Sequence, residues 1–126
     1  MAYASSVTRT KVADSNVDYV YDITETESTA GGNEVAIDLT TTTGRILKIQ
    51  VDITSGSGKV KCQIGVSSSP TGNDVVALTR ERTDIDEQPD GILFFASGKK
   101  LYINNQASAD GLNISTRIFI RETWGL

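Results

Sequence analysis

The sequence predicts an all-β fold, an antiparallel sandwich or barrel, from three observations. Strand-like segments alternate apolar and polar residues with a period of two. Thr, Ile and Val are plentiful, as strands favour, and Gly and Asn/Asp turn signals recur at short intervals. No segment of ten or more residues carries a sustained helical stripe. With 126 residues, the chain is long enough for one domain that buries about two-thirds of its unfolded surface.

The N-terminal residues contain little that could form a core. Residues 1–16 are small and polar, which predicts a flexible N-terminal arm ahead of a single β-sandwich domain at residues 17–126. Simple terminal disorder is one interpretation of the arm, and ordering against a partner is the other. The first strand is expected at residues 17–23, followed by a polar loop at residues 24–33.

The clearest pattern lies at residues 34–66, which predict three strands joined by two short loops. Gly44 is expected to take a left-handed conformation that closes the first loop. Each strand has one apolar face, because apolar residues alternate with polar ones. The apolar positions are Val35, Ile37, Leu39, Leu47, Ile49, Val51, Ile53, Val60, Cys62, Ile64 and Val66.

If both loops form hairpins, the polar face of this run gains two pairs of opposite charge. Asp38 would lie opposite Lys48, and Asp52 would lie opposite Lys61. Each such pair contributes roughly 0.2–1 kcal/mol to the stability of a sheet. The agreement between loop lengths, apolar faces and charges therefore predicts a three-stranded meander.

The middle of the chain predicts short elements. Residues 67–73 form a loop and residues 74–79 a short strand. Residues 80–91 are a long charged connection, and residues 91–96 are an apolar run that predicts a buried strand or an interface segment.

Two segments near the C-terminus predict a further hairpin. Residues 99–106 and 112–122 flank Asp110-Gly111, a strong two-residue turn signal. The bulk on both faces indicates that the rest of the domain or another subunit covers the hairpin on both sides. The expected opposite pairs are Leu101 with Ile120, Ile103 with Ile118, Tyr102 with Phe119, and the like-charged Lys100 with Arg121.

Charge is distributed unevenly along this chain of net charge −4. No Lys or Arg lies between Val12 and Gly44, where seven acidic residues lie. This segment is interpreted as a solvated acidic face or as a surface that meets basic strands of a neighbouring copy. The overall acidity disfavours nucleic-acid binding, which needs a basic footprint.

The residue inventory argues against catalysis and against bound metals or cofactors. There is no His, and Cys62 lies on an apolar strand face, so the common nucleophile pairs and zinc sites are absent. The best metal candidate is the acidic group of Asp84, Asp86, Glu87 and Asp90, but its spacing does not match an EF-hand. A charged surface turn is the preferred interpretation. A glycan-active enzyme that uses only carboxylates stays open as a third hypothesis.

The N-terminus lacks a secretory signal, and no stretch is long enough to cross a membrane. With its size, acidity, polar arm and Thr/Ser/Gly-rich strands, the chain resembles small β-sandwich proteins of tailed bacteriophage virions, above all head decoration or cement proteins. The C-terminal run GKKLYINNQASADGLNISTRIFIRETW, at residues 98–124, has the long-hairpin character of such proteins.

This resemblance implies a jelly-roll-like sandwich that assembles as a homotrimer. It implies a non-enzymatic virion protein, made in the host cytoplasm, that binds the major capsid protein or another virion protein. No nucleic acid and no membrane is expected as a partner. The predicted meander departs from a strict jelly roll, which sends consecutive strands to opposite sheets.

Two sets of residues could carry binding. Contact with a virion partner is expected at the two ends of the chain and at the apolar run, namely at Tyr3, Arg9, Lys11, Ile92, Phe94, Phe95 and Trp124. The alternative function is a carbohydrate-binding β-sandwich module, in which exposed aromatic rings stack on sugars. Its stacking platform would be Tyr19 with Tyr21 or Tyr102 with Phe119.

Overall fold

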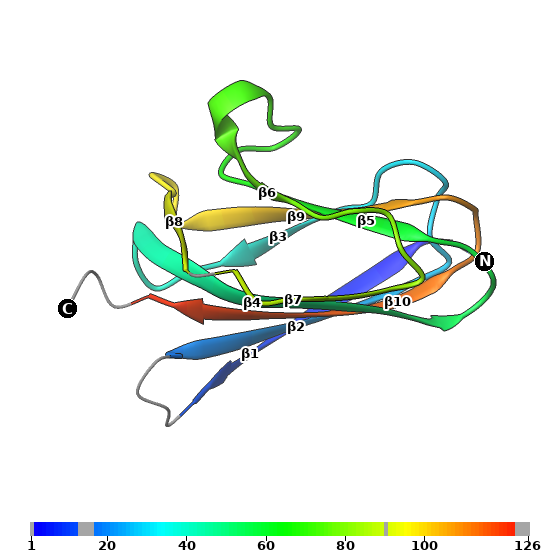
Figure 1. Cartoon of the computed structure of the whole chain (residues 1–126), viewed down its shortest axis with the longest axis horizontal. Helices are drawn as coiled ribbons and strands as arrows, with labels where there is room; N and C mark the ends of the chain where they lie inside the picture. Colours follow the sequence, from blue (N-terminus) through cyan, green and yellow to red (C-terminus); the bar gives the residue numbers. More distant parts are fainter. Residues whose placement is uncertain (1, 13–16, 90, 123–126) are drawn as a thin grey trace.

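The structure, a computed structural model, describes residues 2–12, 17–89 and 91–122. Two antiparallel sheets pack together, which confirms the predicted all-β sandwich (Figure 1). A short 3₁₀ helix, Gly72–Asp74, precedes the sixth strand. The strands are β1 (Ala4–Lys11), β2 (Tyr19–Thr26), β3 (Glu34–Asp38), β4 (Thr43–Ser55), β5 (Val60–Gly65), β6 (Val75–Leu78), β7 (Asp84–Glu87), β8 (Ile92–Phe95), β9 (Lys100–Ala107) and β10 (Asn113–Arg121).

The order of the strands places sequence neighbours in different sheets. The first sheet has the order β1-β2-β10-β4-β7, and β8 also pairs with the start of β4. The second sheet has the order β3-β9-β5-β6. The chain therefore changes sheet at each step from β2 to β5, between β6 and β7, and at each step from β8 to β10. Apolar faces of consecutive strands meet across the core instead of lying side by side.

The predicted hairpin between the segments that form β3 and β4 is wrong. β3 pairs with β9, and Asp38 lies opposite Lys100, not Lys48. Lys100 Nζ lies 2.8 Å from Asp38 Oδ1. The alternation of apolar residues fixes which face of a strand points inward, but it does not fix which strand is its neighbour.

The predicted hairpin between the segments that form β4 and β5 is also wrong. Asp52 in β4 lies opposite Asp84 of β7 on one side and Ser115 of β10 on the other. Lys61 in β5 lies opposite Gln106 of β9. The loop between β4 and β5 crosses from one sheet to the other, a distance of about 10 Å in packed sheets.

The C-terminal hairpin fails for the same reason, because β9 and β10 belong to opposite sheets. Gly111 does take a left-handed conformation, with φ of 77°, but the turn connects the two layers. Tyr102 and Phe119 consequently lie on the outer faces of different sheets. The expected pairing of Lys100 with Arg121 is absent, because Lys100 lies opposite Asp38.

The predicted apolar faces supply most of the core. Of the positions expected in β3, β4 and β5, most are buried and the others pack against the core. The exception is Leu47, where the pairing of β4 with β10 has an irregular register and Ile46 points inward instead.

Gly44 lies within β4 and does not take the predicted left-handed conformation. A Cβ there would approach the Arg121 carbonyl oxygen to 2.7 Å and the Phe94 Cζ to 2.8 Å.

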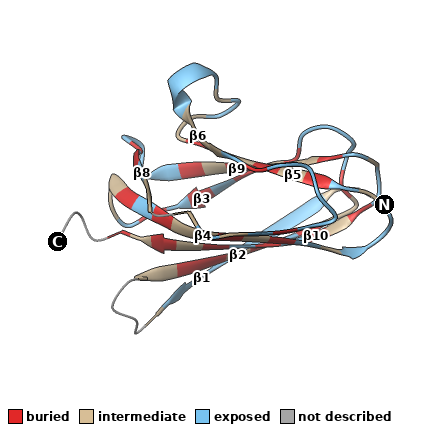
Figure 2. Cartoon of the chain, viewed as in Figure 1, coloured by how far each residue is buried: buried red, intermediate tan, exposed pale blue. Residues whose placement is uncertain are grey.

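Two strands form where the sequence predicts no strand. Residues 4–11, within the predicted arm, form β1, whose eight residues all pair with β2 and are all exposed (Figure 2). Within the predicted charged connection, residues 84–87 form β7, which buries Ile85.

Cys62 is buried as predicted, and burial raises the pKa of its thiol to about 12. Among the described residues, no group of three or more His, Cys, Asp or Glu could hold a metal ion, and Asp90 lies outside those residues. In the same part of the chain, no helix is long and apolar enough to span a membrane.

Candidate functional site

A set of three exposed large hydrophobic residues lies on β6 and β8, two edge strands that approach each other. We call it the β6–β8 patch and define it by Leu78, Leu93 and Phe95, whose exposed fractions are 55%, 51% and 63%. Within the described chain, Val7 is the other exposed large hydrophobic residue. Gathered apolar side chains on a small protein mark contact surfaces more often than isolated ones do.

The alternation of β8 decides which of its residues can meet a partner. Phe94 points into the core and is 3% exposed, whereas Leu93 and Phe95 point outward. Ile92 is half-buried and packs against the core. The predicted contact residue Trp124 lies outside the described residues. Of the predicted apolar run, Phe95 therefore offers the largest exposed surface, and Leu93 accompanies it.

The three predicted contact residues near the N-terminus lie along one side of β1 or just before it. The Tyr3 hydroxyl donates a hydrogen bond to Glu25 Oε2 over 2.6 Å. The Arg9 guanidinium lies 5.3 Å from the centroid of the Tyr19 ring, and its Nη1 donates to the Asp38 carbonyl oxygen over 3.2 Å. Lys11 is exposed at the end of the strand.

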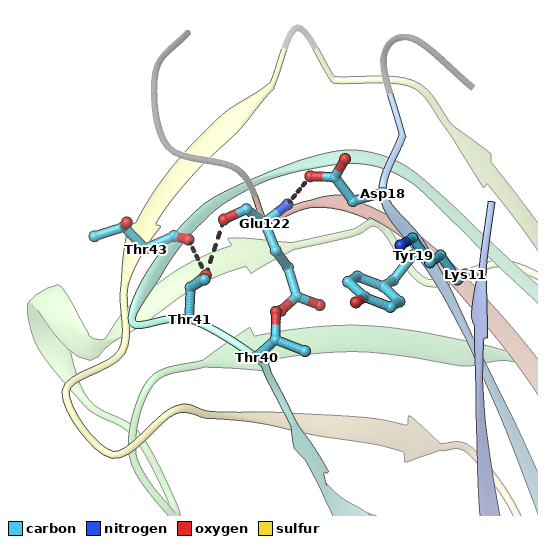
Figure 3. A pocket seen from close by; sticks show the side chains of 7 residues that line it. All are labelled: Lys11, Asp18, Tyr19, Thr40, Thr41, Thr43 and Glu122. Carbon is cyan, nitrogen blue, oxygen red and sulfur yellow. Dashed lines mark hydrogen bonds between the residues drawn. The ribbon is translucent and has the colours of Figure 1, made fainter. Parts of the chain in front are cut away.

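A surface pocket of about 470 Å³ opens beside the end of β10 (Figure 3). Glu122, which is buried, forms its floor and accepts hydrogen bonds from the Thr40 backbone N–H over 2.5 Å and the Thr40 hydroxyl over 2.6 Å. The Tyr21 hydroxyl also donates to this carboxylate. The Glu122 N–H in turn donates to Asp18 Oδ2 over 2.9 Å. The residues that line the pocket are Lys11, Asp18, Tyr19, Thr40, Thr41, Thr43 and Glu122.

These bonds indicate that the Glu122 carboxylate has a structural role. It joins the end of β10 to β2 and to the loop after β3, three segments far apart in the sequence. Burial, followed by the hydrogen bond to Glu122, raises the pKa of the Tyr21 phenol, so the phenol remains a donor. The side chain in this pocket that best suits stacking on a ligand is Tyr19.

The two predicted aromatic platforms are not supported by the geometry. The rings of Tyr19 and Tyr21 lie 6.4 Å apart, but Tyr21 is buried in the core. Tyr102 and Phe119 lie on opposite sheets and cannot form one surface. Lys48 Nζ lies 5.6 Å from the centroid of the Phe119 ring. Tyr19, Tyr102 and Phe119 are each half-buried, and of these three Tyr19 lines the pocket beside β10.

A buried polar cluster escaped the sequence analysis. Asn105 Nδ2 donates to Glu25 Oε1 over 2.5 Å and to Thr116 Oγ1 over 2.8 Å, and all three residues are fully buried. Asn105 Oδ1 has no hydrogen-bond partner among the described residues. Burial raises the pKa of Glu25, although the hydrogen bonds from Tyr3 and Asn105 lower it in part. The sequence did contain one signal for Glu25. Alternate residues of a strand share a face, and Glu25 follows Tyr21 and Ile23 on the inward face of β2.

Comparison of the chain with models of protein families and with curated protein sequences found no match. The described residues present the β6–β8 patch and the pocket beside β10. These surfaces are suited to binding.

Proposed function

We propose that this protein is a non-enzymatic structural component of a virion, a decoration or cement protein that binds a capsid surface as a homotrimer and strengthens it. The observation that carries the proposal is the β6–β8 patch, because a monomer gains nothing from exposing large apolar side chains on two neighbouring edge strands. Several copies of the patch on one oligomer would multiply the affinity for a repetitive surface.

The strand order supports the virion context by analogy. The orders β2-β10-β4-β7 and β3-β9-β5-β6 match the two four-stranded sheets of a jelly roll, with β1 and β8 as additions. We therefore propose a jelly-roll topology for this sandwich. Jelly rolls are frequent in viral capsid domains, and they also occur in lectins and other proteins.

A double variant, Leu93→Ser with Phe95→Ser, is expected to weaken attachment to capsids by at least about tenfold. Burying one such side chain contributes about 1.5–3 kcal/mol, and about 1.4 kcal/mol corresponds to a factor of ten in affinity. The melting temperature should hardly change, because both side chains are already exposed. Cosedimentation with purified tailed-phage heads that lack the protein measures the attachment.

The control for this experiment is Thr54→Ala, an exposed position at the far end of β4. It should bind heads as the wild type does. Equal binding by the double variant and the control would show that the patch is not the contact. A wild-type protein that binds no head would overturn the proposed function, whether or not it oligomerises.

A carbohydrate-binding module is the second candidate, and the pocket beside the end of β10, which Tyr19 lines, favours it. There an aromatic ring lies beside hydroxyl and carboxylate groups of the kind that hydrogen-bond to sugars (Figure 3). Binding on a glycan array that is lost in Tyr19→Ala and kept in Tyr102→Ala would support this function. Absence of any glycan signal would remove it.

A further inference from the structure

The two sheets end unevenly at the edge formed by β1 and β3. The first sheet continues past β2 to β1, whereas the second sheet stops at β3. A hollow of about 330 Å³ lies at this step, lined by Val7, Arg9, Tyr21, Ala36 and Asp38. We call it the β1–β3 step. The second sheet is thus one strand short of covering the inner side of β1, which leaves Val7 39% exposed.

Both strands at the step have an open hydrogen-bonding edge within the described chain. β1 pairs only with β2, and β3 pairs only with β9. β1 is eight residues long and contains no Pro, so each of its residues keeps a backbone N–H for pairing. Long open edges of this kind recruit other strands unless they are blunted.

The alternation of backbone bonds shows which groups of β3 face the open edge. The Asn33 carbonyl accepts from the Asn105 N–H, and the Leu39 N–H donates to the Lys99 carbonyl. Odd-numbered residues therefore bond to β9, and the N–H and C=O groups of the even-numbered residues point outward. One of these, the Asp38 carbonyl, already accepts a hydrogen bond from Arg9.

Charge and direction make β1 of another copy a suitable strand for this edge. β1 carries Arg9 and Lys11 and no acidic residue. β3 carries Glu34 and Asp38 and no basic residue; Asp38 pairs with Lys100 of β9, and Glu34 accepts hydrogen bonds only from the neutral Ser68 and Ser69 among the described residues. The two strands also run in the same direction, because Val7 and Ala36 share the hollow and Arg9 reaches Asp38. Rotation about an axis parallel to the strands preserves this direction in the next copy.

We propose that β1 of a second copy of this chain adds to the open edge of β3, parallel to it, as a fifth strand of the second sheet. The added strand covers the inner side of β1 and buries Val7. Each copy donates one β1 and receives one, so a closed ring of three copies leaves no such edge open. The inference rests on the oligomer in the proposed function and names the surface that forms it.

The two sides of this interface are tested by separate variants. Val7→Lys places a charge in the buried contact, and Ala36→Pro removes an outward N–H of β3 without removing a bond to β9. Both variants are expected to convert the oligomer to a monomer. The dissociation constant of the oligomer should rise at least about a hundredfold. Sedimentation velocity in the absence of heads measures the mass, and circular dichroism checks the fold.

Matched controls lie at or beside the same positions. Thr8→Lys adds the same charge to the outer side of β1, and Ala36→Ser keeps the N–H of residue 36, so both should leave the oligomer intact. A monomeric wild type, or an oligomer that persists in both Val7→Lys and Ala36→Pro, overturns the interface. Retained head binding would then leave the proposed function standing, whereas an intact oligomer without head binding would overturn only that function.

Discussion

A Glu25→Gln variant is expected to unfold at a higher temperature than the wild type at pH 7. The Glu25 side chain is fully buried, and its hydrogen-bond partners, Tyr3 and Asn105, are both neutral. A charged carboxylate in such surroundings is costly, and a neutral amide of the same shape avoids that cost. The amide oxygen can keep the bond from Asn105 Nδ2, and the amide N–H₂ can donate to the Tyr3 oxygen, because a hydroxyl both donates and accepts. We expect a gain of about 1–3 kcal/mol.

The pH dependence of this gain follows from the direction of the pKa shift. Burial raises the pKa of Glu25 above its value in the unfolded chain, so the folded state binds the proton more tightly. The stability contributed by Glu25 is therefore greatest below the unfolded pKa and is lost as pH rises through the folded pKa. The advantage of Glu25→Gln should shrink as pH is lowered from 7 towards the unfolded pKa of the carboxyl, about 4.5.

Other carboxyl groups do not obscure this comparison. Lys100 lowers the pKa of the exposed Asp38 carboxyl, which loses its contribution as pH falls, but it does so equally in both proteins. Thermal melts of wild type and variant between pH 4 and 8 measure the difference, and the exposed Glu81→Gln should show none. A lower melting temperature for Glu25→Gln at pH 7 would show that the buried charge is stabilising.

The sequence predicted the faces of the strands better than their partners. Val51 and Cys62 were expected as neighbours in one sheet, and both are in the core, but in opposite sheets. Asp38 forms an ion pair with Lys100, 62 residues away in the sequence, because the loop after β3 crosses the sandwich. A period of two carries no information about such a crossing, and local charge pairs can suit a hairpin that does not form.

The surfaces were predictable to a similar degree. The apolar run identified Phe95, but its partner in the patch, Leu78, comes from β6, which only the fold brings close. β1 carries no clear alternation of apolar residues, and it forms because β2 offers it a backbone partner. The sequence could have shown that Glu25 points inward, because it lies on the same face of its strand as apolar residues. It could not have shown the partner, because Asn105 lies eighty positions away.

A Glu122→Ala variant is expected to lose about 1–3 kcal/mol of folding free energy. The alanine removes the acceptor of the buried Tyr21 hydroxyl. It also frees the N–H and the hydroxyl of Thr40, but Thr40 is exposed, so water can replace that acceptor. A buried unsatisfied group costs about 1–3 kcal/mol, and the two groups of Thr40 add little because that residue is exposed. Urea denaturation followed by the signal of the tyrosines measures the loss.

Glu122→Gln separates the role of the acceptor from that of the charge. Its amide oxygen can accept from Thr40, and its N–H₂ can donate to the Tyr21 oxygen, because a hydroxyl both donates and accepts. This variant should therefore stay within about 1 kcal/mol of the wild type. The exposed Glu81→Ala should be neutral. Equal and large losses in Glu122→Gln and Glu122→Ala would mean that the negative charge holds the end of β10 in place. Little loss in either would mean that the three segments are joined by apolar packing.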